Sequence, residues 1–275
     1  MKKSFLFLLI AFSFTFLLTP SKISAHELFI QVEENDTDEE LRVDVLWGHL
    51  RDFLDVSNHD NYELYVRYPN GNEEQLSLES IGVHAVSYVP ITEDGDYTFW
   101  AMRTPSTYTP DTGITQLSNQ MAKVIHHVGS SSSIADQPIS LDLEIVPTIH
   151  LPSFTTGVFR GIVQLNGHEV SDATVTAYGP NGEILESTSD HNGVIEFQFD
   201  STGEWLLKAN VRSEEAGTLD GEEYEIVSQT STLLLDTGQT VESSTNIWTL
   251  VAMLVIGLFV GASIVLLTVK KTREE

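Results

Sequence analysis

Cysteine is absent from this chain of 275 residues, and cations are scarce. Without cysteine there are no disulfide bonds and no thiolate metal sites, so a stable fold must rest on the burial of apolar side chains. Lysine and arginine number 14 against 40 aspartates and glutamates, which gives a formal net charge of −26. Such a surface repels nucleic acid and anionic lipid and attracts cations, although a saline or alkaline habitat favours the same composition.

Motifs of catalysis are missing as well. The sequence contains no Gly-x-Ser-x-Gly elbow, no Walker loop and no His-Glu-x-x-His helix. Carboxylates are so abundant that a pair of them carries no information about acid–base chemistry. We therefore assign no catalytic residue and no organic cofactor, and we expect the protein not to be an enzyme.

Long apolar runs occur only at the two ends of the chain. Near the start, Lys2 and Lys3 precede an apolar run at residues 5–18, and "ISA" before His26 is typical of a signal-peptidase site. We predict a signal peptide at residues 1–25, so that the mature protein begins with His26.

The second apolar run, residues 247–269, has no charged side chain and is long enough to cross about 30 Å of hydrocarbon. Two lysines follow it directly, which places a short tail at residues 270–275 in the cytoplasm by the positive-inside rule. We expect a single-pass cell-membrane protein with an extracytoplasmic part, joined to its transmembrane helix by a linker at residues 236–246.

Alternating apolar side chains between the two runs predict an all-β fold. "LRVDVLW" and "YELYVRY" alternate with a period of two, and Asn-Gly or Asp-Gly turns separate many of the segments. No segment shows a convincing amphipathic helix. Short strands at this spacing favour two β-sandwich domains of the immunoglobulin-like or transthyretin-like kind, at residues 26–148 and 153–235. The segment "ISLDLEIVP" from Ile139 either closes the first unit or leads into the second.

A histidine at the mature amino terminus is a candidate metal ligand. After cleavage, the α-amine of His26 and its own imidazole Nδ1 can close a six-membered chelate ring on one ion. Both donors are neutral nitrogens when deprotonated, which suits Ni²⁺, Cu²⁺ or Co²⁺ better than Ca²⁺ or Mg²⁺. The ordinary alternative is an unremarkable terminal residue.

Three further histidines are candidates for a third nitrogen. His49 is the best of them, because Gly48 frees the backbone at the end of a predicted strand. His126 and His127 come next, but adjacent residues of a strand point to opposite faces, so at most one of them shares a face with His26. Each of the three is equally well read as a strand-end, surface or core residue.

Two carboxylates, Glu27 and Asp52, are candidates to orient an imidazole by accepting a hydrogen bond from it.

The second predicted unit resembles the carboxypeptidase-regulatory-like or transthyretin-like sandwich. Asn166-Gly167 precedes "VSDATVTAY", Asp190 and Gly193 precede "VIEFQF", and Gly203 precedes a closing strand. The resemblance implies a fold, and such modules commonly serve as spacers or interaction domains.

The order of motifs in the first unit resembles the extracytoplasmic nickel-uptake family, a domain of unknown function found beside energy-coupling-factor nickel and cobalt transporters. The motifs are "AHELFI", "WGHLRDF", "YELYVRYPNGNEEQL", "GDYTFWAMRTPSTY" and "MAKVIHHVG". Leu50 departs from the family, which usually has proline after Trp-Gly-His. The resemblance implies that the protein binds nickel, or cobalt or copper, and assists its uptake by a membrane transporter.

Two alternative functions remain open at this point. One is a copper-dependent oxidase or monooxygenase, since such enzymes also chelate copper through an amino-terminal histidine on a β-sandwich. The other is a surface adhesion or spacer protein that binds no metal.

Overall fold

The computed structural model describes residues 26–35, 39–56, 58–110, 113–130, 133–139 and 141–238. The expected signal peptide at 1–25, the transmembrane helix at 247–269 and the tail at 270–275 lie outside these residues, as does most of the linker at 236–246. Within the described part, no helix is long and apolar enough to span a bilayer.

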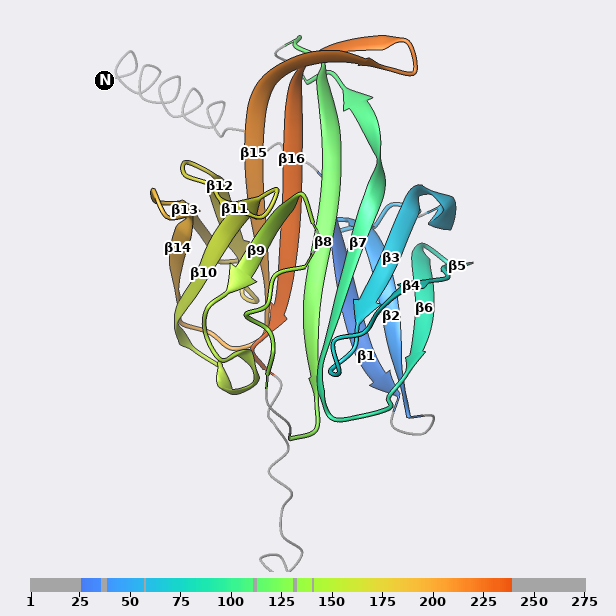
Figure 1. Ribbon diagram of the computed structural model, residues 1–275, viewed down its shortest axis with the longest axis vertical. Coiled ribbons are helices and arrows are strands. Elements are labelled where there is room, and N and C mark those ends of the chain that lie inside the picture. Colours follow the sequence, from blue (N-terminus) through green and yellow to red (C-terminus); the bar gives the residue numbers. More distant parts are fainter. Residues whose placement is uncertain are drawn as a thin grey trace, which may run out of the picture.

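The regular structure of the described chain is almost entirely β-strand, as the alternating pattern predicted, and its longest sheet has eight strands (Figure 1). In spatial order these strands are β13 (Ile184–Thr188), β12 (Thr174–Tyr178), β15 (Glu204–Leu219), β16 (Glu222–Asp236), β8 (Gln116–Val128), β7 (Gly95–Tyr108), β3 (Tyr62–Arg67) and β4 (Glu73–Leu76). We call this the long sheet.

Two smaller sheets pack against it. The first, which we call the amino-terminal sheet, has the order β1 (Glu27–Asn35), β2 (Glu40–Gly48), β6 (His84–Pro90) and β5 (Glu79–Ile81). The second, which we call the β10 sheet, contains β9 (Leu143–Pro147), β10 (Gly157–Leu165), β11 (His168–Glu169) and β14 (Val194–Phe199). Short 3₁₀ turns occupy His59–Asn61 and Leu151–Ser153.

The two smaller sheets cover opposite faces of the long sheet, because neighbouring residues of its strands belong to different cores. Leu206 and Leu234 point into the core beneath the amino-terminal sheet, whereas Leu207 and Leu233 point into the core beneath the β10 sheet. In Figure 1 the two small sheets accordingly stand to the right and left of the central strands β8 and β16. Each core is apolar and largely closed to solvent, which is the source of stability that a chain without cysteine requires.

A parallel pairing joins the two expected units. Ile226 of β16 lies beside Gln116 of β8, and the pairing continues to Leu234 beside Val124. The segment "ISLDLEIVP", which the sequence left between the two units, contains β9. Because β9 pairs with β10, this segment belongs with the later strands. Residues 26–148 and 153–235 therefore share one sheet instead of being linked only by a chain.

Candidate functional site

The register of the first two strands places His26 opposite His49. Glu27 of β1 pairs with Gly48 of β2, so the residues just beyond that pair emerge side by side. Their imidazole rings are stacked, with centroids 5.1 Å apart and an angle of 24° between the planes. The structure thus brings together the two histidines that the sequence ranked highest.

A tight loop after β2 holds His49 in place. Gly48 has φ +148°, and a Cβ there would lie 2.4 Å from the carbonyl oxygen of Phe53. The backbone N–H of His49 donates to that same carbonyl at 3.0 Å. The Phe53 ring stands edge-on to both imidazoles, with centroids 5.4 Å from His26 and 5.3 Å from His49. Glycine is required where the chain turns, and the aromatic ring limits where the imidazoles can move.

The carboxylate of Glu27 is buried between a histidine and a lysine. Its Oε2 is 3.0 Å from Nδ1 of His49, and its Oε1 accepts from Nζ of Lys208 at 2.8 Å. An ionised carboxylate only accepts, so Nδ1–H of His49 is the donor and Nε2 is the ring nitrogen that would bind an ion. Glu27 is therefore placed as the sequence suggested, as an orienting acceptor.

The imidazole of His26 lies beside a different carboxylate. Its Nε2 lies 3.4 Å from Oδ2 of Asp55, within ion-pair reach but outside hydrogen-bond alignment. That nitrogen is shielded from solvent and has no hydrogen-bond partner within the described residues. With Nε2 directed toward Asp55, Nδ1 is the nitrogen suited to act with the α-amine.

A cavity of about 560 Å³ opens beside the two histidines. One wall comes from the amino-terminal sheet and the loop after it, and the opposite wall comes from β12, β13, β15 and the turn between β12 and β13. Among the residues that line the cavity are His26, His49, Phe53, Tyr178, Glu183 and Ile184.

The later strands also hold the loop that follows β2 and carries His49, which we call the histidine loop. The guanidinium of Arg51 donates to the carbonyl oxygen of Gly179 at 2.8 Å and to that of Glu204. Lys208 of β15 reaches Glu27 and lies 5.3 Å from the centre of the Tyr178 ring. Both walls are therefore connected through charged side chains.

Charge beside the cavity is stabilised by local partners. Burial alone would lower the pKa of Lys208, but the charge and hydrogen bond of Glu27, together with Tyr178, outweigh burial and the net pKa is raised. On the same side of the cavity, hydrogen bonds from its own backbone N–H, from Ser201 and from Asn181 lower the pKa of Glu183 to about 2. The ammonium of Lys208 thus lies against Glu27, and the carboxylate of Glu183 lines the cavity at the turn between β12 and β13.

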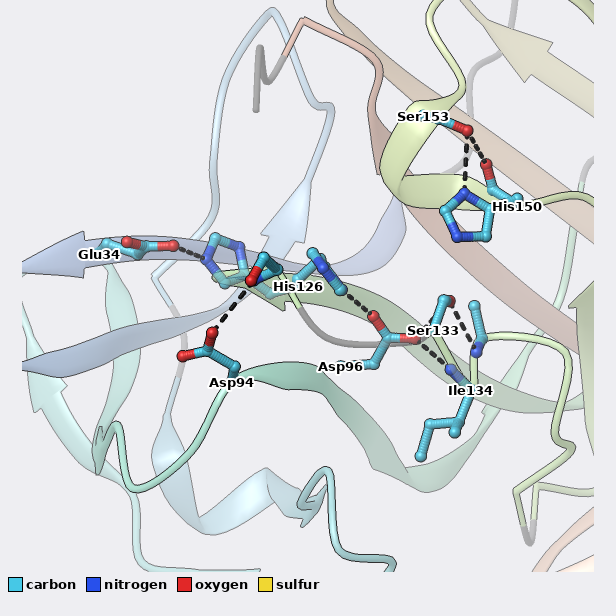
Figure 2. A network of polar contacts seen from close by, with 11 residues as sticks. Glu34, Asp94, Asp96, His126, Ser133, Ile134, His150 and Ser153 are labelled. Carbon is cyan, nitrogen blue, oxygen red and sulfur yellow. Dashed lines mark hydrogen bonds and ion pairs between the residues drawn. The ribbon is translucent and has the colours of Figure 1, made fainter. Parts of the chain in front are cut away.

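The two remaining candidate ligands lie elsewhere. Nε2 of His126 is 2.8 Å from Oε1 of Glu34 (Figure 2). Glu34 is seven residues along β1 from Glu27, about 23 Å for an extended strand. The structure does not bring His126 into the group formed by His26 and His49.

His127 takes part in a buried polar network of its own. Its Nδ1 is 2.6 Å from Oδ1 of Asp96, whose Oδ2 accepts from Ser133 Oγ and from the backbone N–H of Ile134, each at 2.6 Å (Figure 2). Asp96 is fully buried, and these donors satisfy its carboxylate, so the network accounts for His127 structurally.

Across the residues that the structure describes, no group of three or more histidine, aspartate and glutamate side chains is arranged to hold a metal. Among the described residues, the candidate metal ligands are thus a pair of imidazoles, to which cleavage before His26 would add the terminal amine.

Sequence reasoning missed three residues around the site, namely Arg51, Asp55 and Lys208. Lys208 carried a readable signal, because in a chain with few cations it interrupts an apolar stretch whose buried members are Trp205, Leu206, Leu207 and Ala209. Asp52, suggested as an orienting acceptor, lines the cavity, and its backbone N–H donates to the carbonyl of His49 at 3.2 Å.

Comparison with solved structures gives only weak likenesses. One similar structure was solved to explain host cell surface retention of a bacterial ice-binding adhesin. It shares 11% sequence identity with this chain, the match covers 78% of this chain and 65% of that chain, and the TM-score is 0.22. A Ca²⁺-stabilised adhesin of an Antarctic ice-binding bacterium has 13% identity, coverages of 78% and 49%, and a TM-score of 0.22. The fibronectin(III)-like modules of Clostridium thermocellum CbhA have 9% identity, coverages of 79% and 92%, and a TM-score of 0.19.

The chain spans less than two thirds of the two adhesin chains, and TM-scores this low carry no argument about fold or function. No curated protein matches the sequence. A family model does match, over residues 23–213, which include His26, His49 and both walls of the cavity. The chain therefore belongs to the family described as domain of unknown function DUF4198.

Proposed function

We propose that this protein is a membrane-anchored, extracytoplasmic transition-metal-binding protein that assists the uptake of nickel, or cobalt, by a membrane transporter. The metal is cargo, captured at the amino terminus of the mature chain and then released. The proposal includes the two β-sandwich domains, the signal peptide and the carboxy-terminal anchor inferred from the sequence.

The observation that carries the proposal is the pairing of His26 with His49 beside the cavity. With ring centroids 5.1 Å apart, the two imidazoles are close enough for one ion to bind both through metal–nitrogen bonds of about 2 Å. Glu27 and Asp55 stand behind the two rings, as carboxylates do behind metal-bound imidazoles. Removal of the signal peptide would add the α-amine of His26 as a third nitrogen.

This donor set favours late first-row metals. Amine and imidazole nitrogens suit Ni²⁺, Co²⁺ and Cu²⁺, whereas Ca²⁺ and Mg²⁺ prefer oxygen ligands. The acidic surface of the protein raises the local concentration of any divalent cation. Selectivity among the three metals depends on supply as well as on affinity, because copper binds most nitrogen sites more tightly than nickel does.

The position of the site supports transfer to a membrane partner. Arg51 of the histidine loop bonds to Glu204, and Glu204 pairs with Asp236, the last residue of β16. Ten residues then lead to the predicted transmembrane helix and reach at most about 35 Å when extended. The cavity would thus remain close to the bilayer and to a neighbouring transporter.

The test is a metal titration of the processed full chain, purified in mild detergent, with and without one alanine inserted before His26. The insertion converts the α-amine of His26 into an amide but keeps its imidazole. We expect nickel affinity to fall by more than about tenfold, or ~1.4 kcal/mol, and His49→Ala to weaken binding similarly.

Sequencing of the purified amino termini is the control that both forms begin where intended. Equal nickel affinity for the two forms would overturn the chelate. Oxygen-dependent turnover by the reduced copper-loaded protein would favour the oxidase alternative, and failure to bind any of the three metals would favour the adhesion or spacer alternative.

A further inference from the structure

The cavity beside the two histidines is much larger than a metal ion requires. A single water occupies about 30 Å³ in the liquid, whereas the cavity measures about 560 Å³. That volume lies within the range of roughly 300–1,000 Å³ found for pockets that take small organic molecules. The size therefore points to a ligand bigger than a bare or hydrated ion.

The donor count points the same way. His26 with its amine and His49 together supply three nitrogens, all from one wall. A transition metal held by them keeps its other coordination positions directed into the cavity. A small chelating molecule can fill these positions and contact the opposite wall at the same time.

The opposite wall offers a carboxylate and carbon surface. The pKa of Glu183 is lowered by its own backbone N–H and by two further donors. Ser201 Oγ donates to its Oε1 at 2.8 Å, and the backbone N–H of Asn181 donates to its Oε2 at 2.7 Å. Tyr178 and Ile184 add an aromatic ring and an aliphatic side chain beside it. An acceptor with negative charge selects ligands with N–H donors and repels anionic ones.

We infer that the cavity receives its metal as a complex with a small amine-bearing chelator of the amino-acid class, held between His26 and His49 on one side and Glu183 and Ile184 on the other. This inference rests on the proposed function and adds the chemical form of the cargo. It also gives the later strands a direct role in recognising that cargo.

The experiment measures co-retention of chelator and metal on the processed full chain. Nickel is supplied as the aqueous ion, with L-histidine, or with citrate, and the protein is separated by gel filtration and analysed for nickel and for the organic ligand. We expect about one histidine retained per bound nickel and no citrate, since citrate complexes carry negative charge toward Glu183.

A variant on the opposite wall separates cavity binding from metal binding. Ile184→Trp adds bulk to the wall opposite the two histidines and leaves both imidazoles in place as side chains. It is expected to lower affinity for the nickel–histidine complex by about tenfold or more while affinity for aqueous nickel stays within about twofold. Val158→Trp on β10 is the matched control, because Val158 is also an exposed branched strand residue but lies outside the cavity.

Three results would overturn the inference while leaving the proposed function intact. The first is that nickel is retained without histidine when the nickel–histidine complex is supplied. The second is that citrate is retained as well as histidine, and the third is that Ile184→Trp behaves as Val158→Trp does. If the processed chain binds no nickel in any form, the proposed function fails first and the inference fails with it.

Discussion

The ion pair between Glu27 and Lys208 predicts an unusual pattern of stability in a double-mutant cycle. Lys208→Met removes the ammonium that lies 2.8 Å from Oε1 of Glu27, and the Glu27 side chain is only 4% exposed. Leaving one partner of a buried pair uncompensated costs about 3–5 kcal/mol. His49 still donates to the same carboxylate, so we expect the lower end, about 3 kcal/mol.

Neutralising the carboxylate should then restore stability. Glu27→Gln keeps an acceptor for His49 but removes the charge that Lys208→Met leaves unpaired. We expect the double variant to lose only about 2 kcal/mol relative to the native protein, less than Lys208→Met alone. A second substitution that stabilises the first is the diagnostic result.

The assay is urea denaturation of the metal-free protein followed by tryptophan fluorescence. Lys208→Arg, which keeps the charge, serves as the control and should lose less than about 1 kcal/mol. If the double variant is less stable than Lys208→Met, the unpaired charge of Glu27 is not what destabilises that variant, and the ion pair does not connect the two walls in the way described.

Three further predictions use the same assays. His126→Ala and His127→Ala should leave nickel affinity unchanged in titration, because both imidazoles are engaged away from the cavity; a loss for either would place it in the site. Lys123→Met should lower the free energy of unfolding in urea by about 3 kcal/mol, because Nζ of Lys123 is buried 2.5 Å from Oε1 of Glu144. Adding Glu144→Gln to it should return stability to within about 1 kcal/mol of native. Equal stability of Lys123→Met and the double variant would refute this. The pKa of Lys208 is raised in the folded protein, so its stabilising effect is complete below the ordinary lysine value of 10.5 and is lost as pH rises through the higher folded value. The difference in unfolding free energy between the native protein and Lys208→Met should therefore shrink only in that alkaline range. A decrease near neutral pH would contradict the ion pair between Lys208 and Glu27.

Local pattern was sufficient to predict the class of fold and several strands. The alternation at Leu41, Val43 and Val45 reflects burial on one face of β2, and that property is written in the sequence itself. The pairing of β8 with β16 was not predictable in this way. Its partners, such as Gln116 and Ile226, are 110 positions apart and leave no local signal.

In the candidate site, too, residues marked by a local sequence pattern could be predicted, whereas residues that depend on distant strands could not. His26 and His49 were accessible because one stands behind a cleavage motif and the other ends a strand beside glycine. The roles of Arg51 and Lys208 depend on how strands from the two halves of the chain come together, so neither could be assigned from its neighbours in sequence. His126 and His127 showed the opposite problem, because a histidine pair suggests ligands until the acidic partner of each is seen.

The position of β16 in the middle of the long sheet also constrains how the protein folds during synthesis. β8 stays an open edge until it is joined by β16, which is the last strand of the described residues to be made, and contacts of such long range slow folding. Until then, the half-finished sheet presents unpaired backbone to other nascent chains, which is a hazard for aggregation. Chains truncated before Ile226 should accumulate as aggregates, and folding of the complete chain should depend on chaperones that protect this edge.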